Sequence, residues 1–329
     1  MTNSNSERPS EFELIAELFA PLATSPGAFG LTDDVALLVP PAGHEVVLKA
    51  DAVVEGVHFR AEDPADRVAK KALRVNLSDL AAKGAEALGY LLTLNLPDRM
   101  SMTWLADFVR GLSEDQKVYG ISLFGGDTTS TPGPLSIAIS AIGTIPTGTL
   151  TRRSGAKPGD LVFVSGTIGD AAAGLAVLKG GHPGLPELEK EMLVQRYQLP
   201  EPRLALGQAL RGVASASLDV SDGLIGDLGH IADVSKVRIA IDALRIPRSD
   251  ALKAAGDTQK YIVLAATSGD DYEIAFTAPA SKREQVLDTA SRTSTRVTEI
   301  GRVMQGAGVM LLGAKGEEIP VARGGYQHF

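Results

Sequence analysis

Aspartates recur in this sequence within short segments that also carry Gly, Ser or Thr, and few of them stand beside a Lys or Arg. Carboxylates without a cationic partner must face water, bind a proton or bind a metal ion. Small neighbours let a phosphate approach the backbone closely and leave turn N–H groups free to bind it. Together these features indicate magnesium and a polyphosphate. The segments are Leu31–Asp34, Lys49–Asp51, Asn76–Asp79, Gly125–Thr129, Asp219–Gly223 and Ser268–Asp271.

Taken alone, each segment also has an ordinary structural explanation. Gly125–Thr129 fits either a phosphate-binding turn in which Asp127 holds the metal, or a tight turn with an Asx cap. Asp219 and Ser221 project to the same side if the chain is extended, although Ser221 or Asp222 can simply cap the next helix. The joint occurrence of so many acidic segments favours the metal interpretation.

Asp79 stands on the apolar face of a predicted helix over Ala65–Gly84. Apolar residues precede it at helical spacing, at Val75, Ala72 and Val68. A carboxylate on such a face costs several kcal/mol unless it is paired or bound to a cation. Asp79 is therefore a metal-ligand candidate; the alternative is an aspartate in the last helical turn that reaches solvent.

Three further segments have weaker signals. Arg152, Arg153 and Lys157 form a basic cluster that suits phosphate oxygens as well as it suits a solvated linker. Gly166–Asp170 is typical of a strand-to-helix turn that can bind an anion. His58 ends an alternating stretch and has the pattern of a structural histidine.

Composition restricts the class of protein. A chain of 329 residues with 44% hydrophobic residues, 35 Gly and 18 Pro predicts an α/β protein with two domains. The net charge of −8 argues against a nucleic-acid partner, and it makes a site for an anionic ligand depend on metal ions. The absence of Cys excludes disulfides, thiolate zinc sites and cysteine nucleophiles.

The N-terminal residues are polar, and no stretch approaches the roughly 18 consecutive apolar residues of a membrane helix. We therefore expect a soluble cytoplasmic protein that does not bind membranes.

Hydrophobic periodicity predicts two runs of alternating helices and strands. Ser10–Glu13 has the pattern of a capping box for a short helix that ends near Phe19. We place the domain boundary in the Thr-, Gly- and Pro-rich segment 146–160, which gives domains 1–148 and 149–329. The strands are predicted at 35–39, 45–50, 88–96, 121–124, 135–145, 161–165, 216–220, 237–241, 273–277 and 298–303. The helices are predicted at 65–84, 102–119, 188–198, 203–214 and 282–292, with two more after 170 and 223.

In this order, the motifs resemble those of the thiamine-monophosphate kinase family, within the superfamily that includes aminoimidazole ribonucleotide synthetase. The most specific stretches are Lys71–Ala82, Gly125–Thr129, Arg153–Asp160 and Leu218–His230. The resemblance implies ATP-dependent phosphorylation of thiamine monophosphate to thiamine diphosphate by direct in-line transfer with Mg²⁺. It also implies a two-domain α/β (α+β) fold of the aminoimidazole ribonucleotide synthetase type, whose N-terminal mixed-sheet domain pairs in a homodimer.

The resemblance also implies roles for individual residues. Of these we predict Asp51, Asp127 and Asp222 as catalytic. The implied magnesium ligands are Asp34, Asp51, Asp79, Asp127, Asp219 and Asp222. The implied ATP contacts are Gly126, Asp127, Arg153 and Ser221, and the substrate contacts are His58, Asp270, Arg323 and Tyr326.

The sequence departs from the family pattern at several of these sites. Lys49 and Ala50 stand where the family commonly has hydroxyl residues that help to hold metal. Asp270 replaces a Glu, and Arg323 replaces an aromatic residue that packs on thiamine, a role that Tyr326 could take instead. These changes bear on metal count and substrate affinity more than on reaction type.

Two alternatives stay open at this stage. One is another ATP-using enzyme of the superfamily, similar to aminoimidazole ribonucleotide synthetase. The other is a non-catalytic relative that binds Mg²⁺ and nucleotide.

Overall fold

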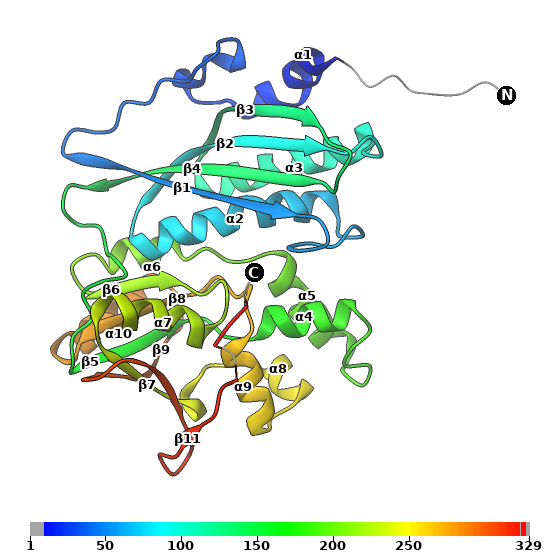
Figure 1. Cartoon of the computed structure of the whole chain (residues 1–329). Coiled ribbons are helices and arrows are strands. Elements are labelled where there is room, and N and C mark those ends of the chain that lie inside the picture. Colours follow the sequence, from blue (N-terminus) through cyan, green and yellow to red (C-terminus); the bar gives the residue numbers. More distant parts are fainter. Residues whose placement is uncertain (1–9, 323, 327–329) are drawn as a thin grey trace. The chain divides into compact units, whose positions relative to one another are not determined.

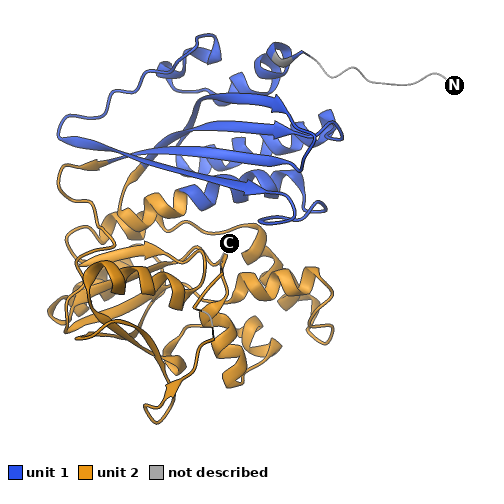
Figure 2. Cartoon of the chain, in the orientation of Figure 1, with its two compact units in different colours: residues 1–76, 87–144 blue, residues 77–86, 145–329 orange. Residues whose placement is uncertain are grey.

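The computed structural model describes residues 10–322 and 324–326. The chain forms two compact units, one from the residues up to 76 with 87–144, the other from residues 77–86 with 145 onward (Figure 2). Helix α2 (Ala65–Lys83) contributes its first part to one unit and its last turns to the other. The predicted two-domain α/β class is confirmed. None of the helices in the described residues combines the length and hydrophobicity that crossing a membrane requires.

The first unit is built on a four-stranded sheet in the order β1-β4-β2-β3 (Figure 1). Helices α2 and α3 (Met102–Tyr119) cover one face of this sheet, and α3 buries Leu105, Phe108 and Leu112. Ser101 caps α3 by accepting a hydrogen bond from the Trp104 N–H, and Gly120 ends it in the left-handed region at φ 65°. The strands are β1 (His44–Val54), β2 (Glu86–Leu96), β3 (Ser122–Ser130) and β4 (Ser136–Pro146).

The opposite face of the sheet carries exposed apolar side chains. Alternation along β1 leaves Val46 at 42% and Leu48 at 75% exposure, and Leu91 on β2 is 40% exposed. N-terminal helical turns lie over the β3 side of this face (Figure 1). They are α1 (Glu11–Leu14), the π-helix Ile15–Phe19, and the 3₁₀-helices Ala20–Leu22 and Pro26–Leu31.

The predicted capping box is confirmed, because the Ser10 N–H donates to Glu13 Oε2 at 2.8 Å and the Glu13 N–H donates to Ser10 Oγ at 3.4 Å. The strand predicted at 35–39 is wrong. This segment has no strand ladder, and its Leu37 N–H pairs instead with the Gly27 carbonyl at 2.8 Å. The prolines at 40 and 41 follow directly and remove two further donors.

Two other local predictions in this unit are also corrected. Asp51 lies inside β1, which runs on to Val54, and not at the end of a strand. Gly125–Thr129 belongs to β3 and is not a turn, although the register against β2 shifts between Tyr90 and Leu91. Gly126 is required by packing, since a Cβ there would lie 1.8 Å from the Leu92 carbonyl oxygen.

The second unit is built on a mixed seven-stranded sheet in the order β11-β10-β7-β9-β5-β8-β6. Within the described residues, β10 and β7 pair in parallel, and the other pairs of this sheet run antiparallel. The last two strands were not predicted. The strands are β5 (Asp160–Ser165), β6 (Ala216–Asp219), β7 (Arg238–Asp242), β8 (Ile274–Pro279), β9 (Val297–Met304), β10 (Gly308–Leu312) and β11 (Glu318–Ile319).

Helix α7 packs its apolar face into the core of this unit through Leu224, Leu228 and Ile231. The helix predicted over 203–214 is shorter than expected, because it ends at Ala209 and the chain turns through Gly212 at φ 69°. The helices are α4 (Asp170–Leu178), α5 (Glu187–Gln198), α6 (Leu204–Ala209), α7 (Leu224–Ser235), α8 (Asp250–Ala255), α9 (Gln259–Thr267) and α10 (Arg283–Arg292). Short 3₁₀-helices occupy Ala243–Arg245 and Ala280–Lys282.

Candidate active site

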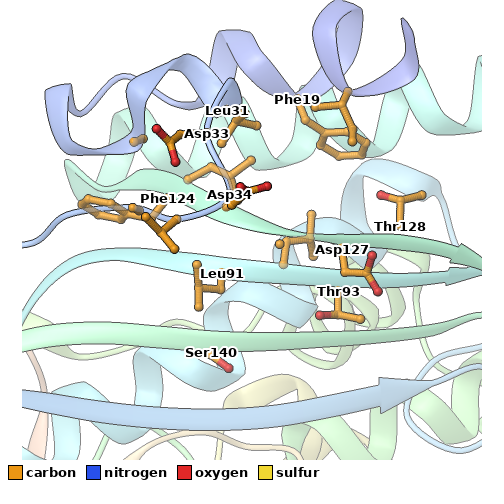
Figure 3. A pocket seen from close by; sticks show the side chains of 18 of the residues that line it. Phe19, Leu31, Asp33, Asp34, Leu91, Thr93, Phe124, Asp127, Thr128 and Ser140 are labelled. Atoms are coloured by element: carbon orange, nitrogen blue, oxygen red, sulfur yellow. The ribbon is translucent and has the colours of Figure 1, made fainter. Parts of the chain in front are cut away.

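The first unit contains a cavity of about 820 Å³ between the N-terminal turns and the open face of the sheet (Figure 3). Asp33 and Asp34 enter it from the covering segment, whereas Asp127 and Thr128 enter from β3. The remaining lining is mostly apolar and includes Phe19. The structure thus brings Asp34, Gly126 and Asp127 to the walls of one cavity, which combines acidic groups with apolar surface.

Asp51 is positioned by two contacts on β1. Its backbone N–H donates to Asn76 Oδ1 at 2.9 Å, which ties the strand to α2. Its carboxylate forms an ion pair with Lys49, Nζ to Oδ1 at 3.0 Å, two residues earlier on the same side of the strand. An ammonium group therefore already contacts one oxygen of this candidate metal ligand.

His58 is held in a turn that follows β1. Its Nδ1 accepts the Val54 N–H at 3.0 Å, and its carbonyl oxygen accepts a hydrogen bond from Lys71 Nζ at 2.9 Å. Lys71 is buried at 3% exposure. The imidazole is half-buried, and its orientation is set by the backbone.

The donor chemistry of the cavity fits a hard divalent cation. Among the described residues, no three His, Asp or Glu side chains converge closely enough to hold a metal ion by themselves. Magnesium commonly needs only one or two carboxylates, since water and substrate phosphates complete its shell. Asp34 and Asp127, together with the Thr128 hydroxyl, offer this type of oxygen donor.

In the second unit, candidate residues gather around the loop that joins β6 to α7. Asp219 ends β6 and is 6% exposed, and Ser221 and Asp222 follow it in half-buried positions. Asp270 and Tyr326 reach the same loop through their backbones. The Asp270 N–H donates to the Ser221 carbonyl at 2.8 Å, and the Tyr326 N–H donates to the Asp222 carbonyl at 2.9 Å.

The segment with Asp270 has an unusual backbone. Asp270 and Tyr272 both lie in the left-handed region, at φ 72° and 51°, and the Tyr272 hydroxyl donates to Asp270 Oδ1 at 3.3 Å. Non-Gly residues in this region are strained and concentrate at functional sites. Next to them, fully buried Glu273 accepts from Arg196 at 2.7 Å and from Arg203 Nη2 at 2.6 Å, which anchors the segment.

Other predicted residues lie elsewhere or outside the described chain. The backbone of Arg153 lies beside Ser235, at the C-terminal end of α7, whereas the loop with Ser221 lies at the N-terminal end. The two ends of this helix are about 16 Å apart. Asp79 is half-buried on α2. Arg323 lies outside the described residues.

The Gly166–Asp170 turn does not leave its N–H groups free for an anion. Asp271 accepts hydrogen bonds from the Gly169 N–H at 2.7 Å and the Ala171 N–H at 3.4 Å. Burial raises the pKa of Asp271 well above its ordinary range, and these N–H groups act in the opposite direction. An internal carboxylate thus occupies the place that the sequence pattern suggested for a ligand.

Sequence reasoning missed Asp227, which lies directly behind the candidate loop. It is 3% exposed, and burial raises its pKa to about 7. The signal was available, because Asp227 shares a predicted helix face with Leu224, Leu228 and Ile231, just as Asp79 shares one with Val75.

Comparison with known proteins assigns the chain to a family. Residues 32–145 match the family model "AIR synthase related protein, N-terminal domain", and residues 157–312 match the corresponding C-terminal domain. A thiamine-monophosphate kinase of Caulobacter vibrioides is 42% identical over 325 residues, 97% of this chain and 91% of that protein. The chain belongs to the thiamine-monophosphate kinase family.

Solved structures of thiamine-monophosphate kinases share the fold. The enzyme from Stenotrophomonas maltophilia K279a is 39% identical with a TM-score of 0.84, covering 94% of this chain and 98% of that chain. AaThiL complexed with AMPPCP and TMP is 31% identical with a TM-score of 0.78, covering 98% of this chain and 100% of that chain. The family resemblance deduced from the motifs is confirmed.

Proposed function

We propose that this chain phosphorylates thiamine monophosphate to thiamine diphosphate with ATP. The observation that carries the proposal is the likeness, over 98% of the chain, to AaThiL complexed with AMPPCP and TMP. The 42% identity to a thiamine-monophosphate kinase over 97% of the chain points to the same reaction.

We propose Mg²⁺ as the cofactor, since the two substrates repel one another. At about 5 Å, each pair of unit charges costs roughly 3 kcal/mol at an effective dielectric near 20. The proposed ligands are Asp34, Asp51, Asp79, Asp127, Asp219 and Asp222, with Asp51, Asp127 and Asp222 essential for turnover. Bound magnesium would neutralise phosphate charge in the transition state.

The residues of the chain then have to bind and align the two phosphates. We assign ATP contacts to Gly126, Asp127, Arg153 and Ser221, and substrate contacts to His58, Asp270, Arg323 and Tyr326. The acceptor phosphate oxygen is already a nucleophile near neutral pH, so no strong general base is required. Catalysis consists of alignment and charge neutralisation, as is usual in phosphoryl transfer.

We also propose that the chain forms a homodimer through the open face of the first sheet. Val46 and Leu48 on β1 would leave water there, and exposed apolar side chains grouped on one face are typical of an interface. Residues 1–148 and 149–329 remain the proposed domains. A cytoplasmic location is part of the proposal, because the reaction consumes ATP.

A coupled assay of ADP release with thiamine monophosphate and Mg-ATP tests the reaction. We expect turnover by the wild type and a loss of at least about 100-fold in D51N and D127N. D98N is the matched control, because Asp98 is exposed on the loop after β2. The proposal fails if the wild type does not phosphorylate thiamine monophosphate, or if D51N and D127N keep full turnover at limiting magnesium.

The Lys49–Asp51 ion pair favours one alternative, a nucleotide-binding relative without catalysis, because an ammonium contacts a proposed metal ligand. Binding of Mg-ATP without any ADP release would support that alternative. Activity with formylglycinamidine ribonucleotide in place of thiamine monophosphate would instead indicate a synthetase-like enzyme.

A further inference from the structure

The loop between β6 and α7 directs three consecutive backbone N–H groups at one carboxylate oxygen. The N–H groups of Ser221, Asp222 and Gly223 donate to Asp227 Oδ2 at 3.1, 3.0 and 3.1 Å. Successive N–H groups arranged in this way form an anion-binding concavity, a nest. Here the side chain of the protein itself fills the nest.

Asp227 is held firmly in this position. It lies in the first turn of α7, on the face that buries Leu224 and Leu228, and its own exposure is 3%. Because both the helix and its apolar face are fixed by the core, the carboxylate is a rigid reference point for the loop.

The carbonyl groups of the same loop hold the neighbouring site segments. The carbonyls of Val220 and Ser221 accept the N–H groups of Tyr272 and Asp270, each at 2.8 Å. The Asp222 carbonyl accepts the Tyr326 N–H at 2.9 Å. A shift of the loop would therefore move the segments of both Asp270 and Tyr326.

The observed conformation of the loop requires a glycine at position 223. Its φ of 131° is unfavourable for other residues, and a Cβ there would lie 2.8 Å from the Thr267 carbonyl carbon. The observed conformation of the loop satisfies these donors, these acceptors and this packing together.

We propose that Asp227 is a positioning residue of the active site, whose carboxyl group fills the nest and fixes the Ser221 and Asp222 side chains. With the nest occupied, the loop cannot bind phosphate through these N–H groups. The loop instead contacts the nucleotide through the Ser221 hydroxyl and the Asp222 carboxylate. The carboxylate is suited to a cation bound to the nucleotide. This last assignment rests on the proposed function, whereas the positioning role does not.

The first test measures the loop without turnover. Amide hydrogen exchange at residues 221–223 and Mn²⁺ affinity are compared in wild type, D227A, D227N and D233N. Asp233 is the matched control, since it is exposed on the same helix. We expect D227A to lose protection at the three amides and to bind Mn²⁺ more weakly, while D227N, which keeps an acceptor oxygen, changes less and D233N does not change.

The second test measures kinetics. A displacement of about 1 Å can reduce a rate about 100-fold, so we expect a loss of that order in kcat/KM for D227A. Both D227A and D227G leave room for formate, and added formate should restore Mn²⁺ affinity and part of kcat/KM in these two variants but not in the wild type or D227N.

Folded D227A with protected amides and wild-type kcat/KM would overturn the proposal. If D227A and D227G do not fold, the D227N variant tests the proposal instead. Wild-type kinetics in D227N, together with free exchange of the amides at residues 221–223, would also overturn the proposal. Failure of the proposed function would appear differently, as a wild type that lacks kinase activity but shows the same protected amides.

Discussion

Two adjacent glycines in β3 differ in what surrounds them. A Cβ on Gly126 would lie 1.8 Å from the Leu92 carbonyl oxygen, whereas a Cβ on Gly125 would meet nothing closer than Leu91 Cδ2 at 3.5 Å. We expect Gly126→Ala to reduce the free energy of unfolding by about 1–3 kcal/mol, the usual range for overpacking. Because it displaces β3 beside Asp127, it should also lower turnover.

Gly125→Ala is the control for this prediction, and urea denaturation with the kinase assay gives both readouts. Equal stability of the two alanine variants would contradict the close approach of β2 and β3 at Gly126.

Individual site residues could be found from the sequence to different degrees. Asp34 and Asp127 stand out as acidic residues among small ones, and the structure places both on one cavity. Asp227 and Asp271 were harder to assign, because their partners are backbone N–H groups and not side chains. Side-chain patterns do not report which N–H groups a fold leaves unpaired.

The N-terminus of α4 depends on Asp271, and this dependence predicts a pH effect on stability. Burial raises the pKa of Asp271 above its ordinary value of 3.8, with Asp170 acting in the same direction and Arg196 against it. As pH rises past that ordinary value, the unfolded chain loses this proton first, so ionisation favours unfolding. We therefore expect the contribution of Asp271 to stability to fall from about pH 4 upward until its raised pKa has been passed.

Urea denaturation at a series of pH values gives the free energy of unfolding of wild type and of D271N. The contribution of Asp271 is the difference between the slopes of these two free energies against pH. D250N, which removes a fully exposed carboxylate, serves as the control. Parallel curves for wild type and D271N would contradict the prediction.

Secondary-structure elements were predicted best where packing follows a simple period. The helices α2 and α3 and the strand β4 combine regular apolar spacing with clear ends, and the sequence located them closely. The segment 35–39 alternates like a strand but has no ladder, and Gly125–Thr129 reads as a turn although it lies in β3. Both errors arise because pairing depends on distant segments that local composition does not reveal.

At the scale of the whole molecule, the open sheet face predicts the oligomeric state. Leu48 is 75% exposed on this face, and a charge there would have to be buried in the proposed dimer. We expect the wild type to sediment as a dimer and Leu48→Glu as a monomer. Val118→Glu is the control, since Val118 is 69% exposed on α3, which covers the other face.

Sedimentation velocity over a range of protein concentrations distinguishes the two states. A monomeric wild type, or a dimeric Leu48→Glu variant, would count against this interface.

The division into two units followed from length and from the second run of alternating elements after residue 160. The sequence did not reveal that α2 belongs partly to each unit. Its residues read as one uninterrupted amphipathic stretch, although the first part of the helix belongs to one unit and its last turns to the other. Periodicity reports which face of a helix is buried but not which core buries it.

The Tyr326–Asp222 hydrogen bond joins two residues that lie far apart in the chain. Gly226 makes a second such bond, to the Gly324 carbonyl at 2.7 Å. During translation, the ribosome synthesises the β6–α7 loop long before the residues that complete it. A chain synthesised only as far as α7 therefore lacks the N–H donor and the carbonyl acceptor that complete the surroundings of this loop.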